Sequence, residues 1–188
     1  TYTLFSLSPK IKSMNLTIRG QKLKHEDNPQ YLGITFDPRL TWNKHIKDTQ
    51  SKAIKRTALL KKLAGTTWGA NMSVLKRTYV GYVRPAMEYG MAAWGTAAKT
   101  NFQRLSRVHN QNLRIITGSI KSTPIQAMET ISGMQSLNDR RENKITTQYT
   151  KFLNLEDHPM YLKTRSTIRS RIKQTNFTTA AKKLSHLW

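Results

Sequence analysis

The chain has 188 residues, of which 32 are Lys or Arg and only 10 are Asp or Glu, so its formal net charge is +22. A surplus of this size on a short chain repels itself unless an anionic partner neutralises it. Nucleic acid is the most common such partner, although an anionic membrane or an acidic protein would also serve. The lack of cysteine excludes a disulfide framework, a thiolate zinc site and a cysteine nucleophile.

Apolar runs and the first residues of the chain indicate where the protein is located and whether the sequence is part of a longer one. No apolar run approaches the roughly 18 residues of a membrane-spanning helix, so we expect an intracellular protein with no membrane partner. The sequence begins with Thr1 and has neither an initiating methionine nor a signal-peptide pattern. We therefore expect it to be a piece of a longer polypeptide.

Residues 1–40 have the pattern of short β-strands separated by turns. Apolar and polar residues alternate in part over 1–7 and regularly over 14–18, which predicts two strands. Residues 25–29 (HEDNP) have turn composition, and 31–36 are predicted to form the next strand. Two or three short strands do not make a stable sheet alone. They need a neighbouring element to pack against.

From residue 41 onward, apolar residues recur at three- and four-residue spacing, which is the period of an amphipathic helix. Gly65 and Gly118 follow the last apolar positions of two such patterns, as expected at helix ends. Pro85 is expected to kink or end the second helix, and Thr123 is expected to cap the fourth. The predicted helices are 41–63, 73–85, 101–117, 124–132 and 139–153.

The last part of the chain differs in composition. Residues 163–188 contain seven basic residues and no acidic residue, which is typical of a loose tail or linker. The fold that the sequence predicts is therefore α+β and predominantly α. A small antiparallel β part at 1–40 precedes a helical bundle at 41–155, and a basic tail follows at 156–188.

Basic residues define the candidate nucleic-acid contacts. The helix at 41–63 carries them at positions that its apolar stripe leaves free, with Asp48 as the single acidic residue, which suits contact with a phosphate backbone. A solvated helix surface is the alternative. Smaller candidate sets lie in the helix at 101–117 and in the tail. The residues concerned are Lys44, Lys47, Lys52, Lys55, Arg56, Lys61 and Lys62, then Arg104 and Arg107 with Arg114 nearby, and finally Arg165, Arg169 and Arg171.

The sequence offers no candidate catalytic or metal-binding residues. Two-metal phosphoryl transfer needs convergent carboxylates, whereas the adjacent acidic pairs at 26–27 and 156–157 lie next to prolines in turn-like segments. The five histidines lack ligand spacing. His45 is expected to pack at the core edge, with a phosphate contact as the alternative. Trp42, Trp68 and Trp94 are expected to pack in the core rather than to stack on bases.

Several segments, in order, resemble one family. They are 28–42 (NPQYLGITFDPRLTW) followed by His45-Ile46, then 63–69 (LAGTTWG), 79–90 (YVGYVRPAMEYG), 93–95 (AWG), 105–118 (LSRVHNQNLRIITG), and 123–125 (TPI) with Leu137 and Arg140-Arg141. Over roughly residues 25–155 the chain resembles the palm end and thumb of reverse transcriptases from non-LTR (LINE-like, jockey-type) retrotransposons.

The resemblance implies a fragment of an RNA-directed DNA polymerase that binds an RNA–DNA template–primer duplex. It implies a palm end at 1–40, a thumb at 41–155, and a primer-grip hairpin at Tyr31, Leu32 and Gly33. A β-bulge or a plain core strand is the alternative for this Gly. Family members carry a Phe/Tyr-x-Asp-Asp motif upstream of Tyr-Leu-Gly, and this chain has no such pair. Catalysis and its Mg²⁺ are therefore expected in an upstream palm, and the fragment alone is expected to be inactive.

The partners that the resemblance implies are element RNA, target DNA and the upstream finger and palm region, in the nucleus or a cytoplasmic ribonucleoprotein. Two other functions stay open. The chain could be a non-enzymatic, basic helical nucleic-acid-binding module derived from such an element, or a partner-binding bundle with incidental charge.

Overall fold

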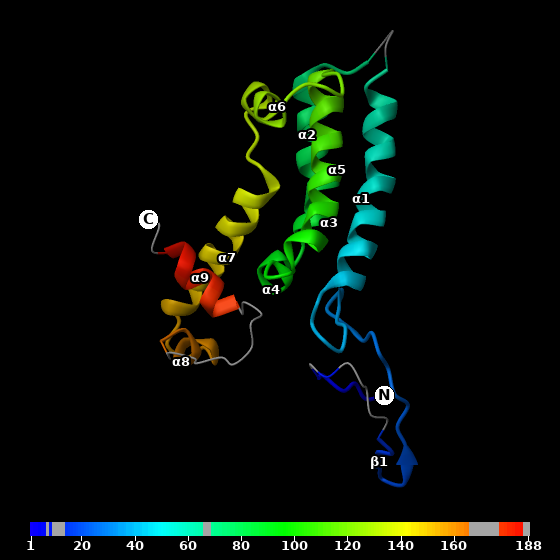
Figure 1. Ribbon diagram of the computed structural model, residues 1–188, viewed down its shortest axis with the longest axis vertical. Helices are drawn as coiled ribbons and strands as arrows, with labels where there is room; N and C mark the ends of the chain where they lie inside the picture. Colours follow the sequence, from blue (N-terminus) through cyan, green and yellow to red (C-terminus); the bar gives the residue numbers. More distant parts are fainter. Residues whose placement is uncertain (7, 9–13, 66–68, 166–176, 186–188) are drawn as a thin grey trace.

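The structure is a computed structural model that describes residues 1–6, 8, 14–65, 69–165 and 177–185 (Figure 1). Trp68, Arg169 and Arg171 lie outside the described residues. The helices are α1 (Asn43–Leu63), α2 (Met72–Thr78), the π-helix η1 (Tyr79–Val83), α3 (Arg84–Glu88), α4 (Met91–Trp94), α5 (Lys99–Thr117), α6 (Ile125–Ser132), α7 (Leu137–Leu153), α8 (Met160–Arg165) and α9 (Phe177–Ser185). The strands are β1 (Thr17–Ile18), β2 (Gln21–Lys22), β3 (Gln30–Tyr31) and β4 (Ile34–Thr35).

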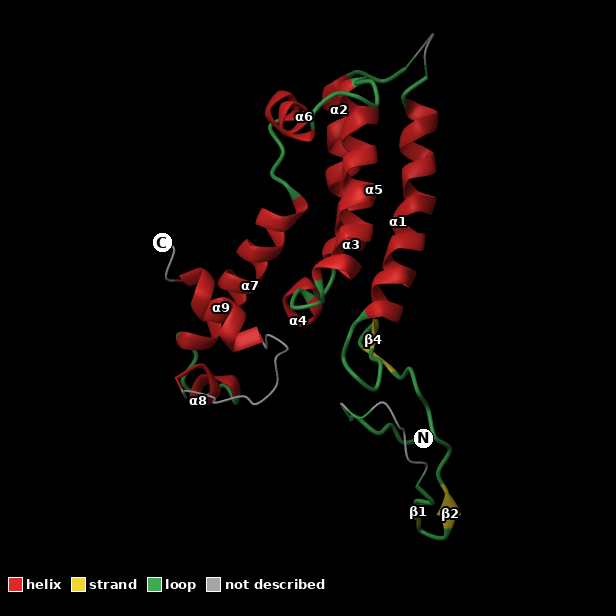
Figure 2. Ribbon diagram, in the orientation of Figure 1, coloured by secondary structure: helices red, strands yellow, loops and turns green. Residues whose placement is uncertain are grey.

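The described part of the chain is α+β and mostly helical, as the sequence predicts (Figure 2). α1 runs up one side of the molecule, α2, η1 and α3 run back down, and α5 runs up again beside α1. The amide of Asn101 reaches the carbonyl of Thr41 at the start of both long helices, at 3.2 Å, which fits their parallel direction. α7 then descends against α4 and α5.

One apolar core fills the space between α1, α2, η1, α3, α4 and α5. Ile46 and Leu60 of α1, Tyr79 of η1 and Leu105 of α5 are completely buried in it. The predicted burial of Trp42 and Trp94 is confirmed, at 7% and 0% exposure. The period-3.6 stripes that predict the helices are therefore the surfaces that hold them together.

The second helix passes through Pro85 instead of ending there. Immediately before the proline, the backbone widens into η1, where the N–H of Arg84 bonds to the carbonyl of Tyr79 five residues earlier. A proline has no N–H, and its ring collides with the carbonyl four residues before it in a regular α-helix. One wider turn relieves this conflict, so α3 continues from η1 as far as Glu88.

The helices after α4 follow the predicted pattern closely, with small shifts at their starts. Gly118 and Gly133 end α5 and α6 in the left-handed conformation, at φ values of 65° and 61°. α6 begins at Ile125, so Pro124 rather than Thr123 occupies its cap position. α7 begins two residues earlier than predicted, because the hydroxyl of Ser136 accepts the N–H of Asp139 at 3.1 Å and caps it.

The expectation of a loose tail is wrong for the described residues beyond 156. α8 and α9 both pack against α7 (Figure 1). Ala181 of α9 is completely buried with Ile145 and Tyr149 of α7, and Phe177 packs against the same cluster. Although the segment is basic, three apolar positions of α9, namely Phe177, Ala181 and Leu184, pack it onto α7.

Two antiparallel hairpins replace the predicted strands of the N-terminal region. β1 pairs with β2, and β3 pairs with β4. The predicted strand at 31–36 is wrong, because Leu32 and Gly33 form a two-residue turn at φ values of 47° and 76°. Two consecutive positive φ angles are typical of a type I′ turn, which suits the strand twist of a short hairpin. Residues 1–6 contribute an isolated bridge between Tyr2 and His25 instead of the predicted strand.

Candidate nucleic-acid interface

The approach to α1 is fixed by Asp37. Its carboxylate accepts the N–H and the hydroxyl of Thr41, each at 2.9 Å, and the N–H of Trp42 at 2.7 Å. These bonds satisfy donors at the helix entrance, which the helix itself leaves unpaired. The β3–β4 hairpin, which ends two residues before Asp37, is thereby held at a defined position relative to α1.

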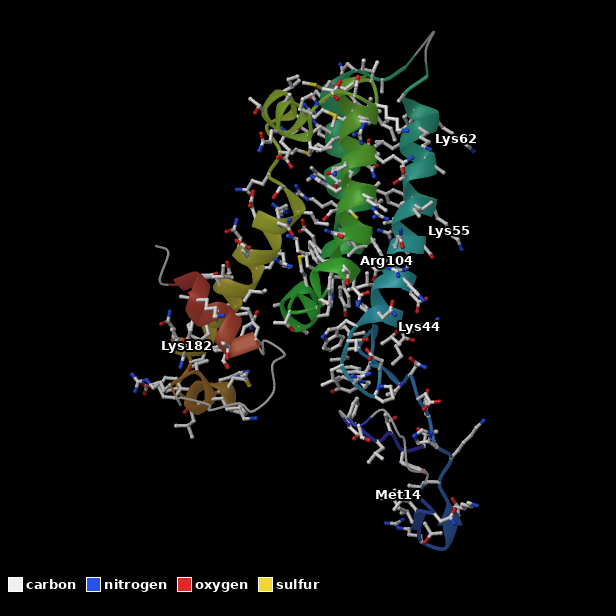
Figure 3. All side chains as sticks on the ribbon, viewed as in Figure 1. Met14, Lys44, Lys55, Lys62, Arg104 and Lys182 are labelled. Carbon is white, nitrogen blue, oxygen red and sulfur yellow. The ribbon has the colours of Figure 1, made fainter. Side chains whose placement is uncertain are left out.

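Three lysines form the outermost line of α1, which we call the lysine ridge: Lys44, Lys55 and Lys62. Positions 11 and 18 residues apart lie about three and five turns apart, so the three side chains share one direction. All three are exposed, and Figure 3 shows Lys55 and Lys62 directed away from α5. The ridge spans about 27 Å at 1.5 Å per residue.

The other α1 lysines flank the ridge. On a helix of 3.6 residues per turn, Lys47 and Lys61 fall toward the side of Thr57, which faces α5, and Lys52 falls toward the side of Arg56, which faces η1. All three lysines are exposed. Asp48 is the single acidic residue of α1, and Lys44 holds it at 3.1 Å. An exposed pair of this kind is weak, so it leaves the cationic character of the face nearly intact.

Arg56 differs from the lysines because it is held by a neighbouring helix. Its Nη1 donates to the carbonyl of Tyr82 at 2.6 Å, and its guanidinium lies 4.8 Å from the centre of the Tyr82 ring. The side chain is half-buried. Arg56 therefore joins α1 to η1, in addition to the phosphate contact that the sequence predicts for it.

The remaining predicted cations lie on other helices than the ridge. Arg104 is half-buried and Arg107 is exposed on α5 (Arg104 in Figure 3). Arg114 is engaged at the end of α5, where it donates to the carbonyls of Asn110 and Lys121, each at 3.4 Å. Arg165 lies on α8, over the ring of its own neighbour Tyr161, on the opposite side of the molecule from α1.

The β3–β4 hairpin is docked onto the helices at its turn and along β4. The hydroxyl of Tyr89 donates to the carbonyl of Leu32 at 2.8 Å, and the Tyr89 ring lies beside Gly33. Ile34 packs so closely on Gly90 that an added Cβ there would lie 2.7 Å from it. Tyr31 and Leu32 are left 68% and 71% exposed at the tip. The predicted hairpin residues thus present an apolar tip on a fixed support.

His45 secures the base of the same hairpin. The N–H of Thr35 donates to its Nδ1 at 3.3 Å, and its ring packs 5.5 Å from that of Trp94. Burial, together with the nearby charge of Lys52, lowers the pKa of His45 below its ordinary value. The neutral ring is the form that can accept this hydrogen bond. Core-edge packing, the first of the two sequence expectations, is confirmed.

A second buried histidine stabilises the bundle itself. Nδ1 of His109 lies 2.6 Å from the hydroxyl of Tyr79, and both residues are buried. Burial, with a smaller effect from the nearby arginines, lowers the pKa of His109 to about 4. Beside this pair, Glu88 binds Arg140 of α7 through both carboxylate oxygens and also Arg84 at 3.4 Å. This half-buried polar contact connects α3 with α7.

Sequence reasoning missed the residues that hold the site together. Tyr82, Tyr89 and Gly90 belong to the segment 79–90 that carries the family resemblance, yet nothing in their spacing shows that they contact α1 and the hairpin. Among the described residues, no three His, Asp or Glu side chains gather closely enough to hold a metal ion. Within the same residues, no helix is both long and apolar enough to cross a membrane.

Comparisons with known proteins bear on the family. The chain is 34% identical over 116 residues, 62% of its length, to the probable RNA-directed DNA polymerase from transposon BS of Drosophila melanogaster. It is 28% identical over 122 residues, or 65% of its length, to a retrovirus-related Pol polyprotein from the type-1 retrotransposable element R1 4 of Nasonia vitripennis. It is 26% identical over 144 residues, or 77% of its length, to the RNA-directed DNA polymerase from mobile element jockey of Drosophila melanogaster.

These similarities confirm the resemblance to the reverse transcriptases of non-LTR retrotransposons. The matches cover 13%, 31% and 15% of the respective relatives, so the chain spans less than a third of the length of each. No family model matches the chain, and no solved structure matches it significantly.

Proposed function

We propose that this chain is a template–primer-binding part of a non-LTR retrotransposon reverse transcriptase. The observation that carries the proposal is the lysine ridge: three exposed lysines in line on α1, flanked by three more, with one acidic residue on the whole helix. The sequence similarity to RNA-directed DNA polymerases supports the same function. Together they favour an RNA–DNA duplex over other anionic partners.

Recognition is of shape and charge rather than of base sequence. The ridge length of about 27 Å corresponds to about eight phosphate steps at 3.4 Å per strand. Lysines that contact phosphates position a duplex without reading its bases. The strand β4 of the hairpin lies at the start of the same helix (Figure 2), and the exposed hairpin tip at Tyr31 and Leu32 would meet the primer end.

Catalysis belongs to another part of the polymerase in this proposal. The magnesium ions of the reaction need convergent carboxylates, and the residues present do not fit that need. Asp27 lies beside His25 in a turn, at 3.5 Å, and Glu156 accepts the hydroxyl of Tyr161. An upstream palm segment would therefore supply the metal ligands, and the fragment would contribute duplex binding alone.

The test compares two triple variants of the 188-residue chain with equal charge change. One variant changes the ridge residues Lys44, Lys55 and Lys62 to Gln. The control changes three exposed lysines outside α1 to Gln, namely Lys121, Lys144 and Lys151. Affinity for an RNA–DNA hybrid duplex is measured between low and high salt. The ridge variant should flatten the slope of log affinity against log salt by roughly 2 to 3, because each lost phosphate contact removes about 0.9. The control should keep the slope of the unchanged chain.

The possible outcomes distinguish between the three functions that the sequence leaves open. Equal slopes for both triple variants would show that the ridge is solvated surface. Equal affinity of the unchanged chain for the hybrid duplex and for other nucleic acids would favour a generic basic binding module. Binding that is absent, or insensitive to salt, would exclude both nucleic-acid functions and favour a partner-binding bundle.

A further inference from the structure

The surface formed by η1 and α3 carries exposed aromatic and small residues in a row. Tyr82 is 44% exposed and Tyr89 is 57% exposed, and Pro85 and Gly81 are also exposed. Their spacing places them on the face opposite the buried residue Met87. An added Cβ at Gly81 would meet no atom within 4 Å, so the surface beside Tyr82 is open.

The π-helix gives Tyr82 an unusual setting. The wide turn before Pro85 occurs where the neighbouring helix contributes Arg56, whose guanidinium covers the Tyr82 ring at 4.8 Å and bonds to its carbonyl at 2.6 Å. A tyrosine held in this way is ordered before any ligand arrives, so little conformational entropy is lost on stacking. Single turns of π-helix are frequent at functional sites.

Positive charge lies along one side of this row. Lys52 is exposed one turn before Arg56 on α1. Because α1 and α3 run in opposite directions, Lys52 lies level with the part of α3 between Tyr82 and Tyr89. The acidic groups facing this region are engaged elsewhere: Asp48 pairs with Lys44, and Glu88 is bound by Arg140. Aromatic side chains interleaved with cations are typical of surfaces that bind a single nucleic acid strand.

The spacing of the two tyrosines matches a strand. The two are seven positions apart, a rise of about 10 Å along a helix, which is roughly three nucleotide steps of 3.4 Å. At the lower end of the row, Tyr89 also supports the hairpin turn through Leu32. A strand on this surface would therefore lead directly to the hairpin tip.

We propose that the exposed face of η1 and α3 binds a single nucleic acid strand, with unpaired bases stacked on Tyr82 and Tyr89 and the backbone held by Lys52. This site differs from the lysine ridge in its ligand, which is an unpaired strand rather than a duplex, and in its main contact, which is stacking rather than charge. It does not depend on the proposed duplex function.

The test measures the affinity of the 188-residue chain for a fluorescent six-nucleotide thymidine strand and for an abasic strand of equal length. At equal backbone charge, each stacked base predicts that the thymidine strand binds roughly 5- to 150-fold more tightly. Tyr82→Ala should remove the contribution of one stacked base, and Tyr82→Phe should keep the full preference. Tyr161→Ala is the matched control, because Tyr161 also carries a stacked arginine, Arg165 at 4.9 Å, but lies on α8.

Several results would overturn the proposal. One is an unchanged chain that binds both strands equally or neither, and this result needs no variant to fold. Another is a folded Tyr82→Ala chain, judged by its circular dichroism, that keeps the full preference. The duplex function is tested separately: the triple lysine variant should weaken hybrid binding and keep the preference for bases.

Discussion

The two hairpins of the N-terminal region have nearly the same backbone and different surroundings. The turn of β1–β2 has φ values of 49° at Arg19 and 76° at Gly20, and the turn of β3–β4 has 47° at Leu32 and 76° at Gly33. Both are two-residue turns between strands of two residues. The first lies exposed at the far end of the molecule, and the second is docked on the helices (Figure 2).

The difference shows that a local turn and its tertiary position are decided separately. In both turns a residue with a side chain is followed by glycine, which adopts the positive φ of the second turn position without strain. Docking of β3–β4 depends on three residues from distant segments: Tyr89 at the turn, Gly90 against β4, and His45 at the base. Because β1–β2 lacks comparable contacts among the described residues, we expect it to respond differently to every change below.

We expect the largest effect from lowering the pH, which destabilises the helical bundle that supports β3–β4. The pKa of His109 is about 4 in the folded chain, against an ordinary value of 6.5. Between these values the unfolded chain binds more protons, so stability falls as the pH decreases from 6.5 toward 4, by about 3 kcal/mol in total. Urea unfolding followed by circular dichroism between pH 7 and 4.5 measures this loss.

His109→Gln removes the titrating group, so its free energy of unfolding should depend less on pH than that of the unchanged chain. The contribution of His45, whose pKa is also lowered, remains in both chains and cancels in the comparison. Identical pH dependence in the two chains would contradict the role given to the buried pair of Tyr79 and His109.

A pair of matched alanine substitutions isolates docking from turn geometry. Gly20→Ala and Gly33→Ala each place a Cβ at a φ of 76°, which costs about 1 kcal/mol in the turn. At Gly33 the new Cβ would also lie 3.3 Å from the Tyr89 ring, whereas nothing lies within 4 Å at Gly20. We expect Gly33→Ala to cost about 2 kcal/mol in total, because the Tyr89 ring must shift and its hydrogen bond weakens.

Urea unfolding of the two alanine variants gives the difference directly. A cost at Gly20 equal to or greater than that at Gly33 would show that the turn conformation, and not the contact with Tyr89, dominates the stability of both hairpins.

The smallest effect is expected from Tyr89→Phe, which removes a single hydrogen bond to the carbonyl of Leu32. Tyr89 is 57% exposed, so water replaces part of the lost interaction, and we expect a loss of about 0.5 to 1 kcal/mol. Amide hydrogen exchange at Thr35 should become a few-fold faster. The N–H of Leu23, which bonds to the carbonyl of Leu16 at 2.8 Å in the other hairpin, is the internal control. Equal acceleration at both amides would indicate general loosening.

The sequence predicts the helices better than it predicts the strands. α1, α5 and α7 carry long apolar stripes of period 3.6, and their observed ends lie within about two residues of the predicted ones. The strand predicted at 31–36 fails because six residues are too few for an alternating pattern to exclude a turn inside it. The sequence does not predict α9, because its basic composition conceals the three apolar positions that pack against α7.

The candidate site likewise has features that the sequence predicts and features that it does not predict. The exposed lysines of α1 follow from helical periodicity, since positions away from the apolar stripe must face solvent. The second role of Arg56 does not follow, because its partner Tyr82 is 26 residues away on another helix. The distance of Arg165 from α1 does not follow from the sequence either, because it depends on how α7 packs against α4 and α5 and how α8 packs against α7.

By itself, the sequence determines the helical segments and the basic face of α1, because each depends on neighbours within a few residues. Only the tertiary structure decides that β3–β4 is docked while β1–β2 is not, that Pro85 lies within a continuing helix, and that Tyr82 and Tyr89 line one surface beside Lys52. Those arrangements arise from contacts between residues far apart in the chain, whose free energy depends on packing and not on local periodicity.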